Sequence, residues 1–388
     1  MARIYMDHNA TTPVASEVAE RMDRAVRDLW GNASSVHHFG QQAKAAVDDA
    51  RGQVASLLGA AAAEVVFTAG GTESDNFAIR GAAEALESTG RRHLIATSIE
   101  HEAVLRTFAA LAKRGWRVTL LPVDASGIVS PEALSDAITD DTALVSVMHA
   151  NNEIGTVQPL GQLAEIARAH GAVVHTDAVQ SASKIPIDVS ALGVDLLSIS
   201  AHKLYGPKGV GALWLRKGLR LTPFMTGGRQ ERNRRAGTEN VPGIVGLGAA
   251  AERGQARMHA EAARVSALRD RLETGLLTRV AGAARNGAVE PRVPNTTNIS
   301  FDRIESESLL IGLDLEGIAV SSGSACSSGT LEPSHVLKAM GLPHLRTLSS
   351  IRFSLGAGNT EADVDRVITV LPPLVDKLRS LTAVSGRR

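Results

Sequence analysis

Lys203 is the residue in this sequence best suited to act as a nucleophilic amine. It follows directly on the apolar run 195–200, whereas most of the eight lysines have polar neighbours that predict solvent exposure. A lysine amine withdrawn from water has a lowered pKa, and its neutral form attacks carbonyl groups. We therefore expect Lys203 to be a desolvated nucleophile or Schiff-base former at the end of a buried strand.

Cys326 is the only cysteine among the 388 residues, and its neighbours are mainly serine and glycine. A lone cysteine usually fills an apolar core position. The run Ser-Gly-Ser-Ala-Cys-Ser-Ser-Gly at 322–329 instead predicts an exposed loop. One cysteine forms neither an internal disulfide nor a multi-cysteine metal site. The setting therefore favours a reactive thiol over a packing role.

A phosphate site is expected where the run 64–68 gives way to Gly70, Gly71 and Thr72. Glycines at a strand-to-helix turn, with Thr72 as the expected cap, leave backbone N–H groups free at a helix N-terminus. The alternative is an ordinary turn. The segment matches neither the dinucleotide fingerprint nor the Walker motif, which disfavours both classes of nucleotide.

Two further strand ends supply a ring and a carboxylate. His101 follows the run 93–97 and is either a ring that contacts a ligand or a helix cap facing solvent. Asp177 follows the run 172–176, where a carboxylate would be partly buried and would need a cationic partner to stay ionised. A phosphate site, a flat ring, an ionised carboxylate and the amine of Lys203 together match pyridoxal 5′-phosphate.

The elements that must position these residues alternate from about residue 60 to about residue 215. Strands are expected at 64–68, 93–97, 117–121, 143–148, 172–176 and 195–200, and helices at 74–88, 102–114 and 160–170. This alternation predicts βαβ units and a mostly parallel sheet. Ligands bind such sheets at the carboxyl ends of the strands, where the residues above lie.

The C-terminal third has a different texture. A long amphipathic helix is expected at about 245–281, strands at 298–301, 319–321 and 350–355, and a packing helix at 360–381. We expect an α/β enzyme with a large domain over residues 15–255. A smaller α+β domain would comprise residues 1–14 and 256–388 and would carry the Cys326 loop.

Composition excludes several classes of protein. Forty-one basic residues balance 41 acidic ones, so no strong field favours nucleic acid or an anionic membrane. The amino terminus lacks a signal-peptide pattern, and no apolar run reaches membrane-spanning length. The pair His37-His38 has no accompanying ligand cluster, and the arginines at 229–235 have no interleaved aromatics. We expect a cytoplasmic protein without a bound metal and without nucleic-acid or membrane partners.

Six motifs stand out in combination: His101 and the segments 71–76, 151–153, 177–180, 200–203 and 321–328. Together they resemble the cysteine desulfurases of the NifS/IscS type, which belong to the class V aminotransferases. The resemblance covers essentially the whole chain. It implies pyridoxal-phosphate-dependent transferase fold type I, which is the aspartate aminotransferase fold. One departure is Ser327, where the family often has threonine.

The resemblance also implies roles for single residues at the cofactor. Lys203 would hold it covalently, His101 would stack on its ring, Asp177 would pair with the pyridine nitrogen, and Gln180 would donate to the ring oxygen. Its phosphate would be held by Gly71, Thr72, Ser200 and His202, and by Thr238 of a second copy in an obligate homodimer. Asn152 and Arg352, with Asn32 nearby, would bind the substrate carboxylate, since a guanidinium makes two charge-assisted bonds to it.

The implied reaction converts L-cysteine to L-alanine and leaves a persulfide on Cys326. Lys203 would move the proton at Cα, with His101 assisting, and Cys326 would pass its sulfur to an acceptor or iron–sulfur scaffold. During transfer Cys326 could ligate a cluster iron. The chain ends at Arg388, shortly after the last expected helix, which puts docking through a long C-terminal tail in doubt. A selenocysteine lyase, which needs no essential thiol, and a non-catalytic partner-binding scaffold are the alternatives.

Overall fold

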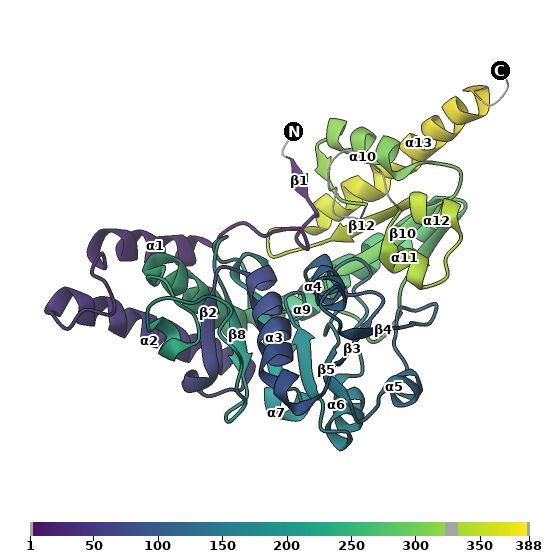
Figure 1. Cartoon of the computed structure of the whole chain (residues 1–388). Helices are drawn as coiled ribbons and strands as arrows, with labels where there is room; N and C mark the ends of the chain where they lie inside the picture. The colour runs from purple at the N-terminus through teal and green to yellow at the C-terminus, as the bar shows by residue number, and fades with distance from the viewer. Residues whose placement is uncertain (1–2, 323–332, 386–388) are drawn as a thin grey trace.

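The computed structural model describes residues 3–322 and 333–385, and its centre is a seven-stranded sheet with strand order β2-β8-β7-β6-β5-β3-β4 (Figure 1). Strands β7, β6, β5, β3 and β4 are parallel neighbours, whereas β8 is antiparallel to both β2 and β7. The strands are β2 (Val65–Thr68), β3 (His93–Thr97), β4 (Arg117–Leu121), β5 (Thr142–Ser146), β6 (Val173–Asp177), β7 (Leu196–Ser200) and β8 (Gly211–Leu215). The expected mostly parallel sheet is therefore confirmed.

Helices cover both faces of this sheet, which explains why its strands are almost continuously apolar. Leu94 and Leu144 point to one face, where they pack with α3 (Gly71–Leu86) and α4 (Glu102–Ala112). Their neighbours Ile95 and Val145 point to the other face. The helices there are α2 (His38–Leu58), α5 (Pro131–Ala137), α6 (Leu160–Ala169), α7 (Val189–Leu192) and the first part of α9 (Val241–Arg279).

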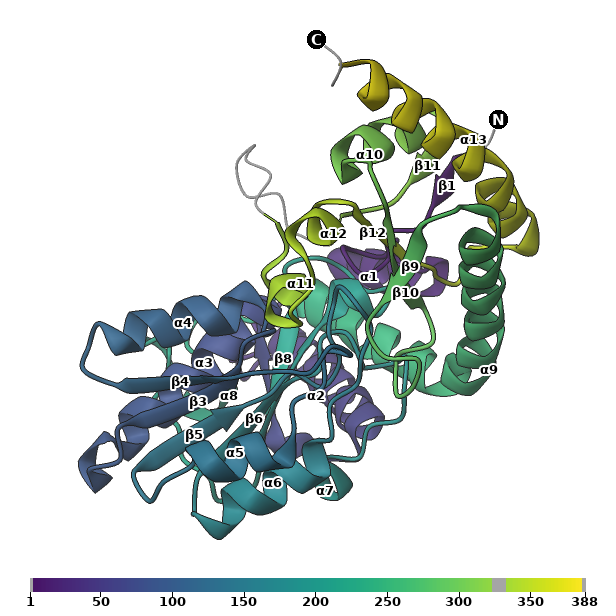
Figure 2. The ribbon, with the colours of Figure 1, turned by 90° about the vertical axis from the view of Figure 1, so that its right-hand side faces the viewer.

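A second core lies in the upper lobe of Figure 1. It is built on an antiparallel sheet of order β12-β10-β9 and on the parallel pair β1-β11. The elements are β1 (Ile4–Tyr5), β9 (Ala283–Asn286), β10 (Thr296–Phe301), α10 (Ser306–Leu315), β11 (Ile318–Ala319), β12 (Ser350–Ser354) and α13 (Glu361–Ser385). Buried Phe301 and Phe353 anchor this core. Figure 2 shows α13 and the end of α9 on its outer side.

Helix α9 contributes to both cores. It begins after Asn240, whose side-chain oxygen accepts a hydrogen bond from the N–H of Gly243. Its first turns pack against α2 and against α1 (Ser16–Asp28), and later residues such as Leu272 and Leu276 join the second core. The domain boundaries expected from the sequence remain predictions.

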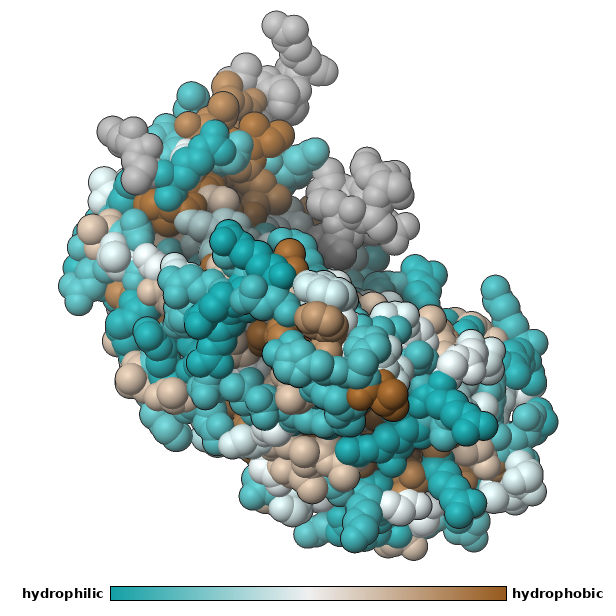
Figure 3. Space-filling view, turned by 90° about the vertical axis from the view of Figure 1, so that its left-hand side faces the viewer, coloured by the Kyte–Doolittle hydropathy of each residue, from teal (hydrophilic) through white to brown (hydrophobic). Residues whose placement is uncertain are grey.

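The expected strands and helices are confirmed to within a few residues at their ends. Helices α1, α2, α5, α7 and α10 and strand β9 were not anticipated from the sequence. The remaining short elements are η1 (Ala62–Glu64), η2 (Glu87–Thr89), η3 (Ala201–Lys203), α8 (Gln230–Asn233), α11 (His335–Ala339) and α12 (His344–Leu348). Polar residues cover most of the face in Figure 3, and apolar residues gather over its upper lobe. No helix in the described ranges is long and apolar enough to cross a membrane.

The amino-terminal segment connects the two cores. Ile4 pairs with Ile318, and Asp7 bridges to Ser354 at the end of β12. The chain then reaches the large sheet, where the N–H of Thr12 donates to the carbonyl of His202 (2.9 Å). Residues 7–12 therefore lie between β12 and the end of β7, beside Lys203.

Candidate active site

A cavity of about 480 Å³ lies at the carboxyl ends of β3, β6 and β7, facing β12. It gathers residues that are far apart in the sequence, as expected for an open parallel sheet. Ten of the residues predicted from the sequence line it: Gly71, Thr72, His101, Asn152, Asp177, Gln180, Ser200, His202, Lys203 and Arg352. The structure thus brings most of the predicted site into one place.

Lys203 ends the short helix η3, which follows β7 directly. Its Nζ donates to the carbonyl oxygens of Asn9 (2.5 Å) and Ala10 (2.6 Å). Burial, together with the nearby charge of Arg352, lowers the pKa of Lys203 to about 8, against the opposing charges of Asp177 and Asp7. A larger share of Lys203 is therefore neutral near pH 7 than for a solvated lysine, which suits an amine nucleophile.

Asp177 ends β6, and its side chain is only 5% exposed. Its Oδ1 accepts a hydrogen bond from the N–H of Val179 (2.9 Å). Burial raises the pKa of Asp177, and the charges of His101 and Lys203 partly oppose this shift. Within residues 3–322 and 333–385, no cationic side chain forms an ion pair with it. A cationic group bound in the cavity would supply the partner that this carboxylate needs.

Two more carboxylic acids lie near Asp177, and sequence reasoning missed both. Asp75 of α3 is 1% exposed, and its pKa is raised well above the usual range by burial and by Asp177. Glu100 follows β3 and accepts from the hydroxyl of Thr97 (2.5 Å) and the N–H of Met148 (2.9 Å). Burial raises the pKa of Glu100 to about 8. With that pKa, the Glu100 carboxyl keeps its proton near pH 7.

The N-terminus of α3 forms one end of the cavity. The helix begins at Gly71, and Gly70 is its N-cap, so the expectation that Thr72 is the cap is wrong. Gly70 has no side chain to accept from the first turn, which leaves N–H groups available to an anion. A Cβ on Gly71 would lie 2.9 Å from a methyl of Val179, so the turn has room for glycine only. The site opens here into a hollow of about 880 Å³.

Ser200 and His202 lie beside this helix end, and both also line the larger hollow. Nδ1 of His202 is 3.1 Å from the hydroxyl of Thr11. Burial, with the charges of Lys203 and Lys208, lowers the pKa of His202 to about 4, so its ring is neutral near pH 7. Together with the backbone of α3, these side chains fit a phosphate group.

His101 is a helix cap, which is one of the two roles that the sequence left open, and it also lies at the cavity. It is the N-cap of α4, where its Nδ1 accepts a hydrogen bond from the N–H of Ala103 (3.1 Å), and its ring also lines the cavity. Because Nδ1 uses its lone pair, the proton of the neutral ring is on Nε2. His101 therefore offers the cavity an N–H donor and an aromatic face.

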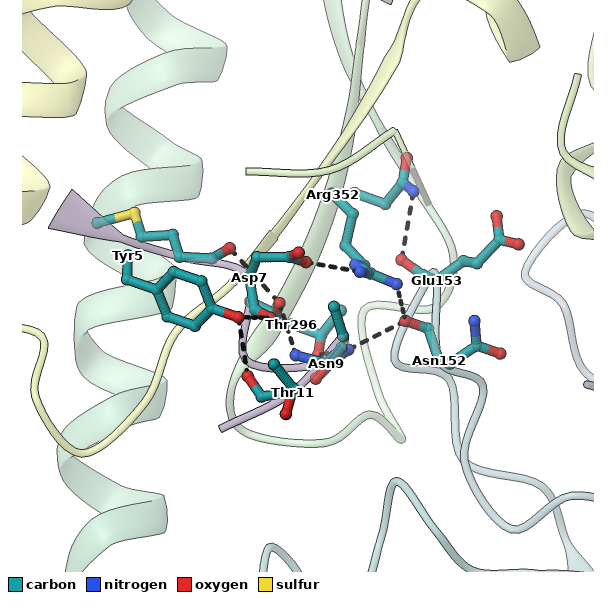
Figure 4. Close-up of polar contacts among 12 residues, drawn as sticks. Tyr5, Asp7, Asn9, Thr11, Asn152, Glu153, Thr296 and Arg352 are labelled. Atoms are coloured by element: carbon teal, nitrogen blue, oxygen red, sulfur yellow. Dashed lines mark hydrogen bonds and ion pairs between the residues drawn. The ribbon is translucent and has the colours of Figure 1, made fainter. Parts of the chain in front are cut away.

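Arg352 reaches the cavity from β12 and is held by two partners (Figure 4). Its Nη2 is 2.7 Å from Oδ1 of Asp7, and its Nη1 donates to the carbonyl of Asn152 (3.0 Å). The Nε is buried and has no hydrogen-bond partner among the described residues. Ser321, which leads toward Cys326, forms backbone hydrogen bonds with Arg352 and also lines the cavity.

Lys184 is a second lysine next to the site, and the sequence gave it the general expectation of exposure. It lies in the turns that follow β6 and is only partly exposed. Its Nζ donates to Oε1 of Gln180 (2.8 Å) and to Oδ1 of Asn9 (3.1 Å). Burial, with the nearby charge of Lys203, lowers the pKa of Lys184 well below its usual value. The feature of the sequence that could have pointed to this contact is that Lys184 lies four residues after Gln180.

Two predicted site residues, Asn32 and Thr238, do not line this cavity. Asn32 is exposed between α1 and α2, and its Oδ1 accepts from the N–H of Ser34 (2.9 Å). Thr238 lines a separate hollow of about 180 Å³ with Arg235. Cys326 lies outside the described residues.

Comparison with known proteins gives a consistent result over the whole chain. Residues 4–367 match the family model described as aminotransferase class-V. The chain is 51% identical to the cysteine desulfurase IscS of Methanosarcina thermophila, over 99% of this chain and 95% of that protein. Among solved structures, a NifS-like protein superposes with a TM-score of 0.91 at 40% identity, covering 97% of this chain and all of that one. A structure described as SspA in complex with cysteine has a TM-score of 0.81 at 37% identity, covering 91% of this chain and 98% of that one.

The cavity and the comparisons agree about the cofactor. Enzymes of this family depend on pyridoxal 5′-phosphate. The uncapped start of α3 fits its phosphate, the unpaired carboxylate of Asp177 fits its pyridine nitrogen, and the partly neutral amine of Lys203 fits its aldehyde. The chain therefore belongs to the cysteine desulfurases of the class-V aminotransferase family, which are pyridoxal-phosphate-dependent enzymes.

Proposed function

We propose that this enzyme removes sulfur from L-cysteine, releases L-alanine and carries the sulfur as a persulfide on Cys326. One observation carries the proposal: Lys203 and Arg352 line the same cavity, and both contact the segment 7–10. An α-amino acid has an amino group to exchange with Lys203 and a carboxylate to pair with Arg352. The site can therefore hold both ends of such a substrate at once.

The residues around the cavity have separate roles in the reaction. When bound, pyridoxal phosphate supplies an electron sink that makes the Cα proton of the substrate acidic. Lys203 is the base for that proton, because its lowered pKa keeps a share of the amine neutral. Arg352 and Asn152 orient the substrate carboxylate. His101 has its Nδ1 occupied by the N–H of Ala103, so it would donate from Nε2 and would cover one face of the cofactor ring.

Sulfur transfer needs the thiolate of Cys326. Its sulfur attacks the substrate sulfur, an S–S bond forms and the C–S bond breaks. The electron pair of that bond stays on the carbon fragment, which takes up protons and leaves as L-alanine. One L-cysteine and one thiol thus give one L-alanine and one persulfide, and no external oxidant or reductant is consumed.

We also propose that the working unit is a homodimer in which Thr238 completes the phosphate site of the other copy. Two features support this. Thr238 does not line the cavity of its own chain. Asn32, exposed outside the cavity, would reach the substrate carboxylate only if a neighbouring copy brought it there.

The proposed sulfur acceptor is a protein of iron–sulfur cluster assembly or another sulfur carrier. We place the enzyme in the cytoplasm, because a reducing compartment keeps the single cysteine available as a thiol. The relatives named IscS and NifS-like support the assembly role.

The test is a matched pair of variants, Cys326→Ala and Ser328→Ala, assayed with L-cysteine for alanine and for protein-bound persulfide. Cys326→Ala should keep the visible absorbance of the bound cofactor and lose persulfide and alanine formation, while Ser328→Ala retains both products. Alanine formation at the wild-type rate by Cys326→Ala would overturn the persulfide route. Selenide release from L-selenocysteine by that variant, without activity of the wild type on L-cysteine, would identify a selenocysteine lyase instead.

A further inference from the structure

Gln180 lies at the wall of the cavity, and both its amide oxygen and its amide nitrogen already form hydrogen bonds within the protein. It is 5% exposed. Its Oε1 accepts from Nζ of Lys184 (2.8 Å), and its Nε2 donates to the carbonyl of Asn9 (3.0 Å). A side-chain amide has two N–H donors, so one N–H remains. Because Gln180 lines the cavity, this N–H is available to a ligand there.

The two contacts together fix the orientation of this amide. Rotating it by 180° would place its NH₂ group against the amine of Lys184 and its oxygen against the carbonyl of Asn9. Two favourable hydrogen bonds would become two unfavourable contacts. Lys184 and the backbone of Asn9 therefore favour the same orientation of the Gln180 amide, one at its oxygen and the other at its nitrogen.

The position of Lys184 is itself well supported. A second hydrogen bond joins its Nζ to Oδ1 of Asn9 (3.1 Å), and the side chain of Asn9 is anchored to Thr296 (2.8 Å) and to the carbonyl of Asn152 (3.0 Å). The two bonds that Nζ of Lys184 donates, to Gln180 and to Asn9, need only two N–H groups. A lysine amine keeps two N–H groups even when it is neutral. The arrangement holds whether or not Lys184 carries a charge.

We propose that Lys184 is a positioning residue for the cofactor ring: it fixes the amide of Gln180 so that its free N–H is directed at the ring oxygen of pyridoxal phosphate. This inference rests on the proposed role of the cavity as the cofactor site. A donor at that point stabilises the deprotonated oxygen, whereas an amide oxygen there would repel it. Lys184 thus biases the protonation state of the bound cofactor without touching it.

The experiment compares Lys184→Met with Lys217→Met, an exposed lysine, as the matched control. The visible absorbance of the cofactor bound to Lys203 is titrated against pH, and cofactor affinity is measured by equilibrium dialysis. Lys184→Met should raise the apparent pKa of that absorbance change by about one unit, a tenfold change in proton affinity. It should also weaken cofactor binding. Lys217→Met should titrate like the wild type.

A second background tests the route through Gln180. In Gln180→Leu the amide is gone, so adding Lys184→Met should produce no further shift in the titration. An equal shift in both backgrounds would overturn the inference, as would a wild-type titration of Lys184→Met. If Lys184→Met does not fold, Lys184→Gln replaces it in the experiment. Glutamine keeps a donor at this position, so Lys184→Gln should titrate close to the wild type. In that case, a wild-type titration of Gln180→Glu would overturn the inference. If the wild-type protein showed no cofactor absorbance, that result would instead contradict the proposed function.

Discussion

Arg352 and Asp7 form an ion pair of 2.7 Å that joins β12 to the amino-terminal segment beside the cavity (Figure 4). The pair occupies Nη2 of the guanidinium, and the carbonyl of Asn152 occupies Nη1. Asp7 therefore holds the arginine in place before any substrate arrives. A substrate carboxylate that binds here must share the guanidinium with Asp7.

Arg352→Lys should lower kcat/KM for L-cysteine by about 100-fold. An ammonium cannot make the paired contacts of a guanidinium, and one lost hydrogen bond to a charged group costs about 1.5–3 kcal/mol. The effect should fall mainly on KM. Cofactor absorbance should remain, since Arg352 is proposed to act on the substrate. Steady-state kinetics beside Arg24→Lys, an exposed arginine, provide the check, and equal kinetics for both variants would contradict the assignment.

Lys203 should make cofactor loading pH-dependent. Only the neutral amine reacts with the aldehyde, and burial lowers the pKa of this amine to about 8. Loading of the apoenzyme should therefore accelerate about tenfold per pH unit below pH 8 and level off above it. Stopped-flow absorbance between pH 6.5 and 9.5 measures this. Lys203→Ala should develop no visible band, and a loading rate that still rises steeply above pH 9 would contradict the lowered pKa.

The sequence predicted the large sheet and most of the cavity because strand ends in a parallel sheet meet at one edge. Asp177 and Lys203 follow apolar runs, so their place and their partial burial could be read directly. The pairing of Arg352 with Asp7 could not, since it joins residues 345 positions apart that meet only when the two cores pack together. Lys184 was missed for a related reason. It shared the general expectation that a lysine is exposed, and its contact with Asn9, 175 positions away, forms only in the folded chain.

Glu100 should make the apoenzyme less stable as pH rises. Its folded-state pKa is raised from 4.5 to about 8 by burial, so between these values the folded protein binds a proton that the unfolded chain does not. Stability from this group is present below pH 4.5 and is lost as pH rises toward 8. Glu100→Gln mimics the protonated acid and should increase the free energy of unfolding at pH 8 by on the order of 2 kcal/mol relative to wild type.

Denaturant unfolding at pH 5.5 and pH 8 gives the comparison for Glu100. The gain from Glu100→Gln should shrink at the lower pH, where the wild-type carboxyl is already protonated for most of the folded population. Glu316→Gln, an exposed acid in the second core's lobe, should show no such difference. A pH-independent gain for Glu100→Gln would point to packing instead of ionisation.

We expect Glu231 to be essential for the conformation of segment 229–240, which carries Thr238. Its carboxylate makes two bonds of 2.7 Å to the guanidinium of Arg51 and accepts from the N–H of Phe67 (3.0 Å), all in a buried setting. These contacts hold Glu231, Arg232 and Asn233 at positive φ, a backbone state that costs free energy outside glycine. Glu231→Gln removes the charge and leaves Arg51 buried without its ionic partner, which should lower the free energy of unfolding by about 3 kcal/mol.

The matched control for Glu231→Gln is Glu252→Gln, whose ion pair with Arg21 is exposed to solvent and should contribute about 0–1 kcal/mol. Because segment 229–240 carries Thr238, Glu231→Gln should also release cofactor faster than Glu252→Gln does. Equilibrium unfolding measures the first effect, and dilution-induced loss of visible absorbance measures the second. A variant that is destabilised but keeps wild-type cofactor release would separate the anchoring role of Glu231 from the proposed phosphate contact of Thr238.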